Sequence, residues 1–336
     1  MAGSITYVDD QSPGISRRRH GRYWQYFDAS GKRITDRDEI DRLNGIGLPP
    51  AYRDAWFCPK PNGHIQAIGY DDRGRKQYRY HPDFREKQET AKYERCLEFG
   101  KVLPKLRKRV QADLRKRQLG RDTVIAAVVR LLDTGRIRVG NESYAKENKS
   151  FGATTLRNRH AKVAGRTVKM RFKAKSGIER ELAITDATLS RIVKRCQDLP
   201  GQNLFQYLDE DGEPQPVTST DVNDYIREAT GEDFTAKHFR TWSASVIAFD
   251  QVCGAGEKGV GLKAMLEPVA ETLGNTPAIS RKSYVHPAVI EAVQEAPRKR
   301  LSLQCPRSTK YLSSAERGLI GFLAKAARRK GRTSKS

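Results

Sequence analysis

Residues 273–284 read LGNTPAISRKSY. Thr276 followed by Pro277 is the pattern of a helix start, with the threonine as N-cap and the proline in the first turn. In the short helix that follows, Arg281 and Lys282 come three and two residues before Tyr284. A tyrosine hydroxyl has a pKa of about 10 and is a poor nucleophile unless positive charge favours the phenolate. The stretch therefore predicts a tyrosine nucleophile that needs cations from elsewhere in the fold.

Three cations elsewhere in the chain are candidates for this role. Arg138 follows a predicted helix stop, and Lys175 falls at the tip of a predicted β-hairpin. Arg240 shares a helix face with Lys237 near a predicted helix start, where backbone N–H groups attract phosphate oxygens. Asn275 is a further polar candidate next to the tyrosine helix. Taken singly, each of these patterns is also that of a solvated basic loop or of a plain helix cap.

The composition favours a nucleic-acid partner. The 336 residues include 63 basic and 40 acidic side chains, for a net charge of +23, and the pI is about 9.9. An anionic membrane or an acidic protein could also attract this charge, but the basic residues are spread along the chain among tyrosines and tryptophans. No apolar run approaches the roughly 18 residues of a membrane span, and the N-terminus does not have the pattern of a secretory signal. We therefore expect a cytoplasmic protein.

The chain divides by composition into a β-rich region, residues 1–82, a mainly helical region, 83–327, and a basic tail, 328–336, that we expect to be disordered. In the first region, turn signals separate short alternating runs and predict hairpins. These turns lie at 28–31, 62–63 and 71–74.

In the second region, a three-stranded antiparallel set is predicted over 162–184. Apolar residues at helical spacing predict the helices around it, and Asp122 is the expected N-cap of the first, with Gly135 as its stop. Later helices are predicted at 186–197, 220–229, 236–249, 260–273 and 313–328. The fold class is therefore α+β.

Residues 77–80, QYRY, alternate in character, so Gln77 and Arg79 lie on one face of a strand and Tyr78 and Tyr80 on the other. Two interpretations remain open from the pattern alone. The tyrosines could lie in the core of a half-buried strand. Alternatively, the polar and aromatic groups contact a DNA duplex, where glutamine can pair with an adenine edge.

Motifs for cofactors are weak or missing. Residues 254–259 match G-x-G-x-x-G by letter, but they lie in a helical region without the β-α-β context and predict an interhelical linker. The sequence has no G-x-x-x-x-G-K-[ST] motif, no H-E-x-x-H motif and no paired aspartate cluster, and its five cysteines include no C-x-x-C pair. We therefore expect neither ATP nor a metal to take part.

Seven segments occur in the order and approximate spacing of type IB DNA topoisomerases, and the chain resembles the compact, poxvirus-like form found in bacteria. The resemblance covers about residues 20 to 295. The segments are GRKQYRY at 74–80, IRVG at 137–140, SYAKEN at 143–148, FGATTL at 151–156, FKAK at 172–175, KHFRT at 237–241 and LGNTPAISRKSY at 273–284.

The resemblance implies a small β-rich domain and a larger helical catalytic domain with a short antiparallel sheet, and these two domains together clamp duplex DNA. Tyrosine recombinases share the fold of the catalytic domain. Tyr284 resembles the family nucleophile, which forms a 3′-phosphotyrosyl link and releases a 5′-hydroxyl. Arg138 and Arg240 resemble the arginines that hold the non-bridging oxygens, and Lys175 resembles the general acid. Because the phosphotyrosyl bond conserves energy, religation is expected to need no ATP and no metal.

Asn275 departs from the family pattern, which has histidine at this position. An amide can donate a hydrogen bond to a non-bridging oxygen but cannot carry charge or move a proton. We therefore expect Asn275 to orient the phosphate and the site to lack an imidazole-dependent pH limb. The expected DNA contacts are Lys76, Gln77, Tyr78, Tyr80, Tyr144 and Lys237.

The predicted function is relaxation of positive and negative supercoils by a monomer acting on double-stranded DNA in the bacterial nucleoid. The main alternative is a site-specific tyrosine recombinase. Lys237 argues against it, because recombinases usually have histidine there, and so does the β-rich N-terminal region. A non-enzymatic DNA-binding scaffold would leave the arginines, the lysine and the tyrosine unexplained.

Overall fold

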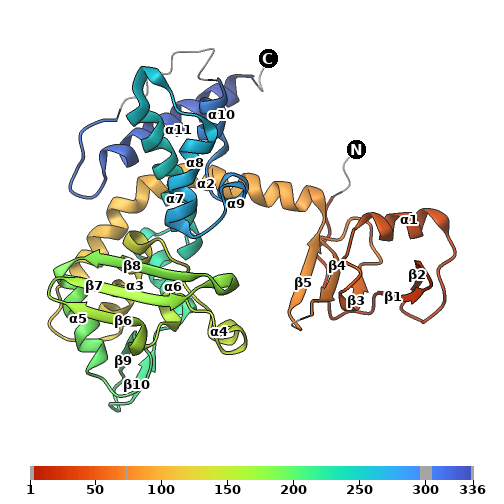
Figure 1. Ribbon diagram of the computed structural model, residues 1–336, viewed down its shortest axis with the longest axis horizontal. Coiled ribbons are helices and arrows are strands. Elements are labelled where there is room, and N and C mark those ends of the chain that lie inside the picture. The colour runs from red at the N-terminus through yellow and green to blue at the C-terminus, as the bar shows by residue number, and fades with distance from the viewer. Residues whose placement is uncertain (1–3, 73, 296–304, 334–336) are drawn as a thin grey trace. The chain divides into compact units, whose positions relative to one another are not determined.

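The computed structural model describes residues 4–72, 74–295 and 305–333. The chain forms two compact units, Met1–Ala91 and Lys92–Ser336 (Figure 1). The boundary lies within the long helix α2 (Pro82–Asp113), which begins in the first unit and continues into the second. The sequence analysis placed a domain boundary at residue 82, which is where this helix begins.

The first unit is a five-stranded antiparallel sheet with the strand order β2-β1-β3-β4-β5. Helix α1 (Arg37–Gly45) contributes Leu43 to a small core against one face of the sheet, together with Ile15, Tyr26 and Phe57. The strands are β1 (Ile15–His20), β2 (Tyr23–Phe27), β3 (Arg53–Phe57), β4 (Ile65–Tyr70) and β5 (Lys76–Tyr80).

The predicted turns are present in this sheet, but two details differ. Strand β2 pairs with the preceding strand β1, and the hairpin predicted around the turn at 28–31 is reduced to the isolated bridge between Phe27 and Arg33. The β3–β4 hairpin forms as predicted. Gly63 is required there for space, because a Cβ atom would lie 2.4 Å from the Sγ of Cys58, and not for a positive φ. Helix α1, which the sequence analysis did not predict, begins where the Asp36 side chain accepts from Asp38 N–H.

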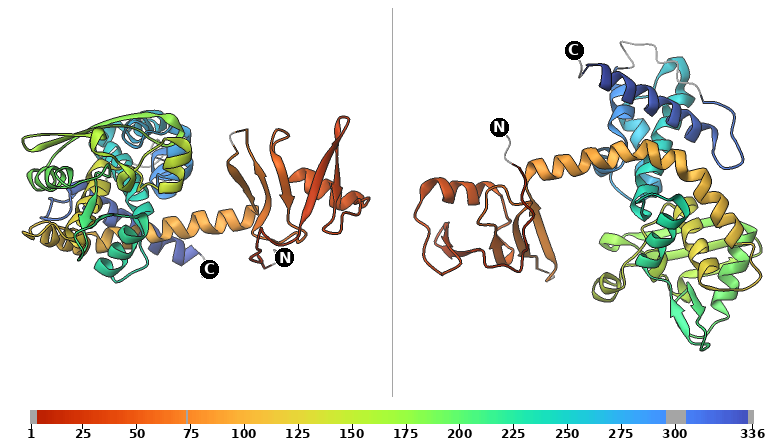
Figure 2. Two further views of the ribbon diagram at one scale, coloured as in Figure 1. Left: turned by 90° about the horizontal axis from the view of Figure 1, so that it is seen from below. Right: turned by 180° about the vertical axis from the view of Figure 1, so that it is seen from behind.

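The second unit combines helices with two small sheets (Figures 1 and 2). Strands β6, β7 and β8 form one antiparallel sheet, and β9 and β10 form the other. Figure 1 shows α7, α8, α10 and α11 at one end of the unit and the two sheets at the other. The helices are α3 (Arg121–Gly135), α4 (Glu142–Asn148), α5 (Ala187–Gln197), α6 (Ser219–Thr230), α7 (Ala236–Ala255), α8 (Leu262–Leu273), α9 (Pro277–Ser283), α10 (Pro287–Glu295) and α11 (Ser314–Thr333). The strands are β6 (Ala161–Ala164), β7 (Thr167–Lys173), β8 (Glu179–Thr185), β9 (Gln206–Leu208) and β10 (Pro214–Pro216).

Helix α3 is the centre of the core of this unit, and residues along most of its length are fully buried. Because its apolar residues are not confined to one stripe, neighbouring elements cover it on several sides. These elements include α5, α6 and α7. The predicted α+β class, with a small β-rich region before a mainly helical one, is confirmed.

Three ends of predicted elements differ in the structure. The N-cap of α3 is Gly120 rather than Asp122, which lies in the first turn, and the left-handed residue that ends α3 is Arg136 rather than Gly135. Helix α11 continues through residues 328–333, so these residues are helical, unlike the predicted disordered tail. Residues 334–336 lie outside the described part of the chain. In the described residues, no helix is both long enough and apolar enough to span a bilayer.

Candidate active site

Tyr284 lies at the end of helix α9, and local hydrogen bonds hold its backbone in place. The Thr276 hydroxyl accepts from Ile279 N–H and caps the helix start, with Pro277 in the first turn as predicted. At the other end, Tyr284 N–H donates to the carbonyl of Ser280 at 3.1 Å. The buried Ser245 hydroxyl on α7 accepts from His286 N–H at 2.9 Å. The nucleophile candidate is therefore held against α7.

Arg240 extends from α7 beneath this tyrosine and is only 5% exposed. Its Nη1 donates to the carbonyl of Arg136 at 2.7 Å, and its Nη2 donates to the carbonyl of Leu273 at 3.1 Å. The guanidinium carbon lies 4.9 Å from the centroid of the Tyr284 ring. Arg240 thus links the ends of α3 and α8 to the tyrosine.

Arg138 lies in the loop that follows α3, and two glycines allow a close backbone contact behind it. Gly140 has a φ of +100°. A Cβ atom on Gly152 would lie 2.5 Å from the backbone nitrogen of Gly140 and 2.7 Å from the carbonyl oxygen of Arg138. The Arg138 carbonyl also accepts from Ala153 N–H at 2.8 Å. The segments 137–140 and 151–156, both singled out in the sequence, therefore form one structure that orients Arg138.

Asn275 joins Arg138 to the end of α8. Its Oδ1 accepts from the Nη2 of Arg138 at 3.2 Å, while its backbone N–H donates to the carbonyl of Ala270. Its Nδ2 is buried and has no hydrogen-bond partner among the described residues, and neither has the Nε of Arg240. Buried polar groups are normally paired. The site therefore keeps two unused donors.

The two arginines change the ionisation of the groups around them. Burial, with a smaller contribution from the charge of Arg138, lowers the pKa of Arg240 to about 10. Burial acts to raise the pKa of Tyr284, but the charges of Arg240 and Arg138 and hydrogen bonding to them outweigh it, and the pKa is lowered. A tyrosine with a lowered pKa is a better nucleophile at neutral pH.

Lys175 lies on the β7–β8 hairpin. It begins the 3₁₀ turn Lys175–Gly177 at the tip of the β7–β8 hairpin, where Ser176 has a φ of +67°. The side chain is exposed, and among the described residues it has no hydrogen-bond or ion-pair partner. The structure therefore brings together Tyr284, Arg138, Arg240 and Asn275, and among the described residues Lys175, on the neighbouring hairpin, forms no hydrogen bond or ion pair with them.

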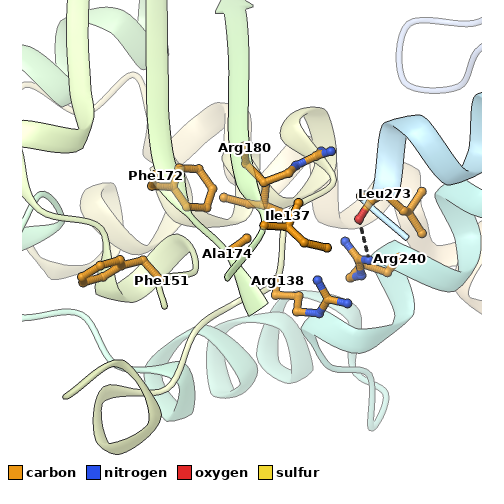
Figure 3. A pocket seen from close by; sticks show the side chains of 10 residues that line it. Ile137, Arg138, Phe151, Phe172, Ala174, Arg180, Arg240 and Leu273 are labelled. Atoms are coloured by element: carbon orange, nitrogen blue, oxygen red, sulfur yellow. Dashed lines mark hydrogen bonds between the residues drawn. The ribbon is translucent and has the colours of Figure 1, made fainter. Parts of the chain in front are cut away.

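Two cations near the site were not identified from the sequence. Arg180, on β8, lines the same small cleft as Arg138 and Arg240 (Figure 3). Lys92, on α2, donates from Nζ to the carbonyl of Ser283 and lies 5.6 Å from the centroid of the Tyr284 ring. Local sequence carries no signal for either residue, because each meets the site through a contact distant in the chain.

The predicted DNA-contacting residues are mostly accessible. Tyr78 and Tyr80 are 40% and 46% exposed, and their rings stack at 5.8 Å, so they share one face of β5 and lie outside the core. Gln77 lies on the other face, where its Nε2 donates to Asp71, and Lys76 pairs with Asp10. In the second unit, Tyr144 lies half-buried on α4, and Lys237 is exposed in the first turn of α7.

Comparison with known proteins assigns the family. The family described as eukaryotic DNA topoisomerase I, catalytic core, matches residues 81–305. The family described as bacterial DNA topoisomerase IB, N-terminal domain, matches residues 23–71. The chain belongs to the type IB DNA topoisomerases. DNA is therefore its substrate, and the resemblance seen in the sequence is confirmed.

Individual topoisomerases are similar over most of the chain. DNA topoisomerase 1B of Acanthamoeba polyphaga mimivirus is 33% identical over 298 residues, which are 84% of this chain and 88% of the viral protein. DNA topoisomerase 1B of Vaccinia virus (strain Copenhagen) is 22% identical over 233 residues, which are 68% of this chain and 72% of that protein. These similarities support a topoisomerase and give no support to the recombinase alternative.

Proposed function

We propose that this topoisomerase relaxes positive and negative supercoils with Tyr284 as the nucleophile and with Arg138, Arg240, Asn275 and Lys175 as its catalytic partners. One strand of the duplex is cut, the free end rotates, and the same bond is resealed. The proposal follows from the family of the chain together with the arrangement of charge around one phenol group.

In the cleavage step, the phenolate oxygen of Tyr284 attacks the scissile phosphorus and the bond from phosphorus to the 5′-oxygen breaks. Negative charge grows on the non-bridging oxygens, and the guanidinium groups of Arg138 and Arg240 offer planar donors that match it. The amide Nδ2 of Asn275 supplies a third donor. Lys175 gives a proton to the leaving 5′-oxygen, which departs as a hydroxyl group.

Religation reverses each bond change. The 5′-hydroxyl attacks the phosphotyrosyl phosphorus, its proton returns to Lys175, and the phenolate of Tyr284 leaves. The number of phosphoester bonds is the same before and after each step, so the balance needs no nucleotide and no second reactant. Lys175 must reach the phosphate for both steps, and the exposed hairpin tip leaves its long side chain unpaired within the described residues.

The observation that carries this proposal is the contact between Tyr284 and Arg240, with the guanidinium carbon 4.9 Å from the ring centroid. A buried arginine beside a tyrosine whose pKa is lowered favours the phenolate that phosphodiester attack uses. Nε of Arg240 and Nδ2 of Asn275 are buried donors without a hydrogen-bond partner among the described residues, and phosphate oxygens entering the site would satisfy them.

A plasmid-relaxation assay with EDTA and without ATP tests the proposal. The wild type should relax both positively and negatively supercoiled plasmid, and Tyr284→Phe should be inactive while binding duplex with unchanged affinity. Tyr207→Phe, on β9 and outside the site, is the matched control and should keep full activity. Relaxation by Tyr284→Phe, or dependence of the wild type on ATP, would contradict the proposal.

On the DNA side, we propose that Lys76, Gln77, Tyr78 and Tyr80 of the first unit contact the duplex, and that Tyr144 and Lys237 contact it from the second. The exposed tyrosines and the basic charge of the chain support this. We further propose that the enzyme acts as a monomer on double-stranded DNA in the bacterial nucleoid. Light scattering of the active species, with and without a short duplex, tests the oligomeric state.

A further inference from the structure

The C-terminal end of helix α8 joins several parts of the site. The last carbonyl groups of a helix have no partner within the helix and need donors from outside it. Here Ala270 accepts from the backbone N–H of Asn275. The carbonyl of Leu273 accepts from the Nη2 of Arg240 at 3.1 Å. The two carbonyls between them, of Glu271 and Thr272, are bound by a single side chain.

That side chain is Arg180, which reaches α8 from strand β8. Its Nη1 donates to the carbonyl of Glu271 at 3.0 Å, and its Nη2 donates to the carbonyl of Thr272 at 2.6 Å. The guanidinium also lies against Gly274, where a Cβ atom would be 3.0 Å from Nη1. A cation suits this position because the C-terminus of a helix carries partial negative charge.

Arg180 is also attached to the hairpin that carries Lys175. It pairs across the hairpin with Phe172 on β7, and Lys175 lies on the turn between these two strands. Phe172 and Arg180 both line the cleft beside Arg138 and Arg240 (Figure 3). The side chain of Arg180 therefore connects the base of the Lys175 turn with the helix end that precedes Asn275.

We propose that Arg180 is a positioning residue that docks the Lys175 hairpin on the C-terminus of α8, so that Lys175 reaches the phosphate held by Arg138, Arg240 and Asn275. The inference rests on the proposed roles of these residues. Both terminal nitrogens of Arg180 are engaged by carbonyl groups of α8, so its guanidinium ties the hairpin to this helix end.

The choice of leaving group provides a test specific to Lys175. A DNA substrate with oxygen at the 5′ bridging position needs a proton when the bond breaks, whereas one with sulfur there does not, because a thiolate is a much better leaving group. Arg180→Met keeps the length of the side chain but loses both donors. On the oxygen substrate, single-turnover cleavage by Arg180→Met should be about 10²-fold slower, the lower end of what a general acid contributes. On the sulfur substrate, most of the rate should return.

Three further variants complete the experiment. Lys175→Ala should show the same recovery with sulfur, and Arg180→Lys should fall between Arg180→Met and the wild type because an ammonium group cannot bind two carbonyls in the fork of a guanidinium. Arg171 lies on the same hairpin and forms exposed ion pairs with Glu179 and Glu181, so Arg171→Met should match the wild type. Duplex affinity and melting temperature should be close to wild type in all of them.

Two outcomes would overturn the inference. One is an Arg180→Met rate equal to wild type on the oxygen substrate, and the other is an equal defect on both substrates, which would assign Arg180 to the oxyanion side or to folding. If Lys175→Ala itself showed no recovery with sulfur, the proposed role of Lys175 would fail instead, so the two failures are distinguishable.

Discussion

The Nη2 of Arg138 donates a 3.2 Å hydrogen bond to the Oδ1 of Asn275. This contact fixes the orientation of the amide, so the Nδ2 is the end left to donate, and it has no partner in the described part of the chain. Asn275 therefore acts as an acceptor toward the protein and is placed to act as a donor toward a phosphate oxygen. The family has histidine at this position. The amide of Asn275 donates a hydrogen bond but does not give up or take up a proton.

Asn275→Asp tests this arrangement, because aspartate has the same shape and keeps the acceptor for Arg138 but loses the donor. We expect cleavage to slow by about 10²-fold or more, the cost of removing one donor to a developing oxyanion. Asn275→His should remain active and gain a pH-dependent limb near the imidazole pKa of about 6.5 that the wild type lacks. A pH–rate profile of single-turnover cleavage measures both effects. An Asn275→His profile that coincides with wild type would argue against phosphate contact at this position.

The lowered pKa of Tyr284 gives a second prediction. Because Arg240 and Arg138 favour the phenolate, Tyr284 should ionise at lower pH than a free tyrosine. Arg138→Gln removes one positive charge and should move this ionisation to higher pH. The ultraviolet phenolate signal, taken as the difference between each protein and its Tyr284→Phe version, measures the shift. Tyr225 is an internal contrast, because burial and the carboxylate of Asp113 raise its pKa. A Tyr284 signal that does not move in Arg138→Gln would show that Arg138 does not act on the phenol.

Gly152→Ala should disturb the site through the backbone. The added Cβ atom would lie 2.5 Å from the backbone nitrogen of Gly140, which a side-chain movement cannot relieve, so the loop carrying Arg138 must shift. A displacement of about 1 Å at a catalytic group can cost about 10²-fold in rate. We expect that loss in single-turnover cleavage with unchanged duplex affinity. Gly254→Ala, within α7 and with no atom within 4 Å of the added Cβ, is the control and should cleave at the wild-type rate.

Local patterns in the sequence were sufficient to predict the helix that positions Tyr284 and the hairpin that positions Lys175. Thr276 and Pro277 start α9 as predicted, because a cap and a first-turn proline act within a few residues. The hairpin with Lys175 at its tip also forms as predicted, because turn residues separate alternating strands.

The remaining features depend on contacts between distant segments. Arg180 donates a hydrogen bond to the carbonyl of Glu271, 91 residues away in the chain. A local sequence pattern cannot predict such a contact. Asp122 has the residue type of an N-cap, yet the N-cap of α3 is Gly120 and Asp122 lies in the first turn. The exposure of Tyr78 and Tyr80 shows that these side chains lie outside the core, which strand alternation alone had left open.

Tyr78→Ala and Tyr80→Ala should weaken duplex binding without destabilising the fold, because both side chains are exposed on the edge strand β5. Loss of a base contact costs about 1–3 kcal/mol, or roughly fivefold to 150-fold in affinity. Fluorescence anisotropy with a labelled duplex at fixed salt measures the change. Tyr23→Ala removes a tyrosine that is 78% exposed on the opposite edge strand β2 and is the matched control. Equal losses in Tyr23→Ala and Tyr78→Ala would show a general effect of surface aromatics.

Arg107→Met should be among the most destabilising single changes in the second unit. Arg107 lies between Asp133 on α3 and Glu316 on α11, with a nitrogen–oxygen distance of 2.8 Å to each, and Glu316 also accepts from the indole of Trp242 at 3.1 Å. Removing the guanidinium leaves the largely buried carboxylates of Asp133 and Glu316 without this partner. We expect the free energy of unfolding to fall by about 3–5 kcal/mol. For a unit of this size, the melting temperature should fall by roughly 6–20 °C.

The partner carboxylate provides the check on this mechanism. Glu316→Gln in the Arg107→Met background removes one of the two stranded charges and should recover part of the lost melting temperature, so the two changes are not additive. Lys101→Met, which breaks only the exposed pair with Glu98 on the same helix α2, should change the melting temperature little. Glu316→Gln could instead lower the melting temperature of Arg107→Met by as much as it lowers that of the wild type. The destabilisation by Arg107→Met would then come from lost packing of the arginine side chain and not from its charge.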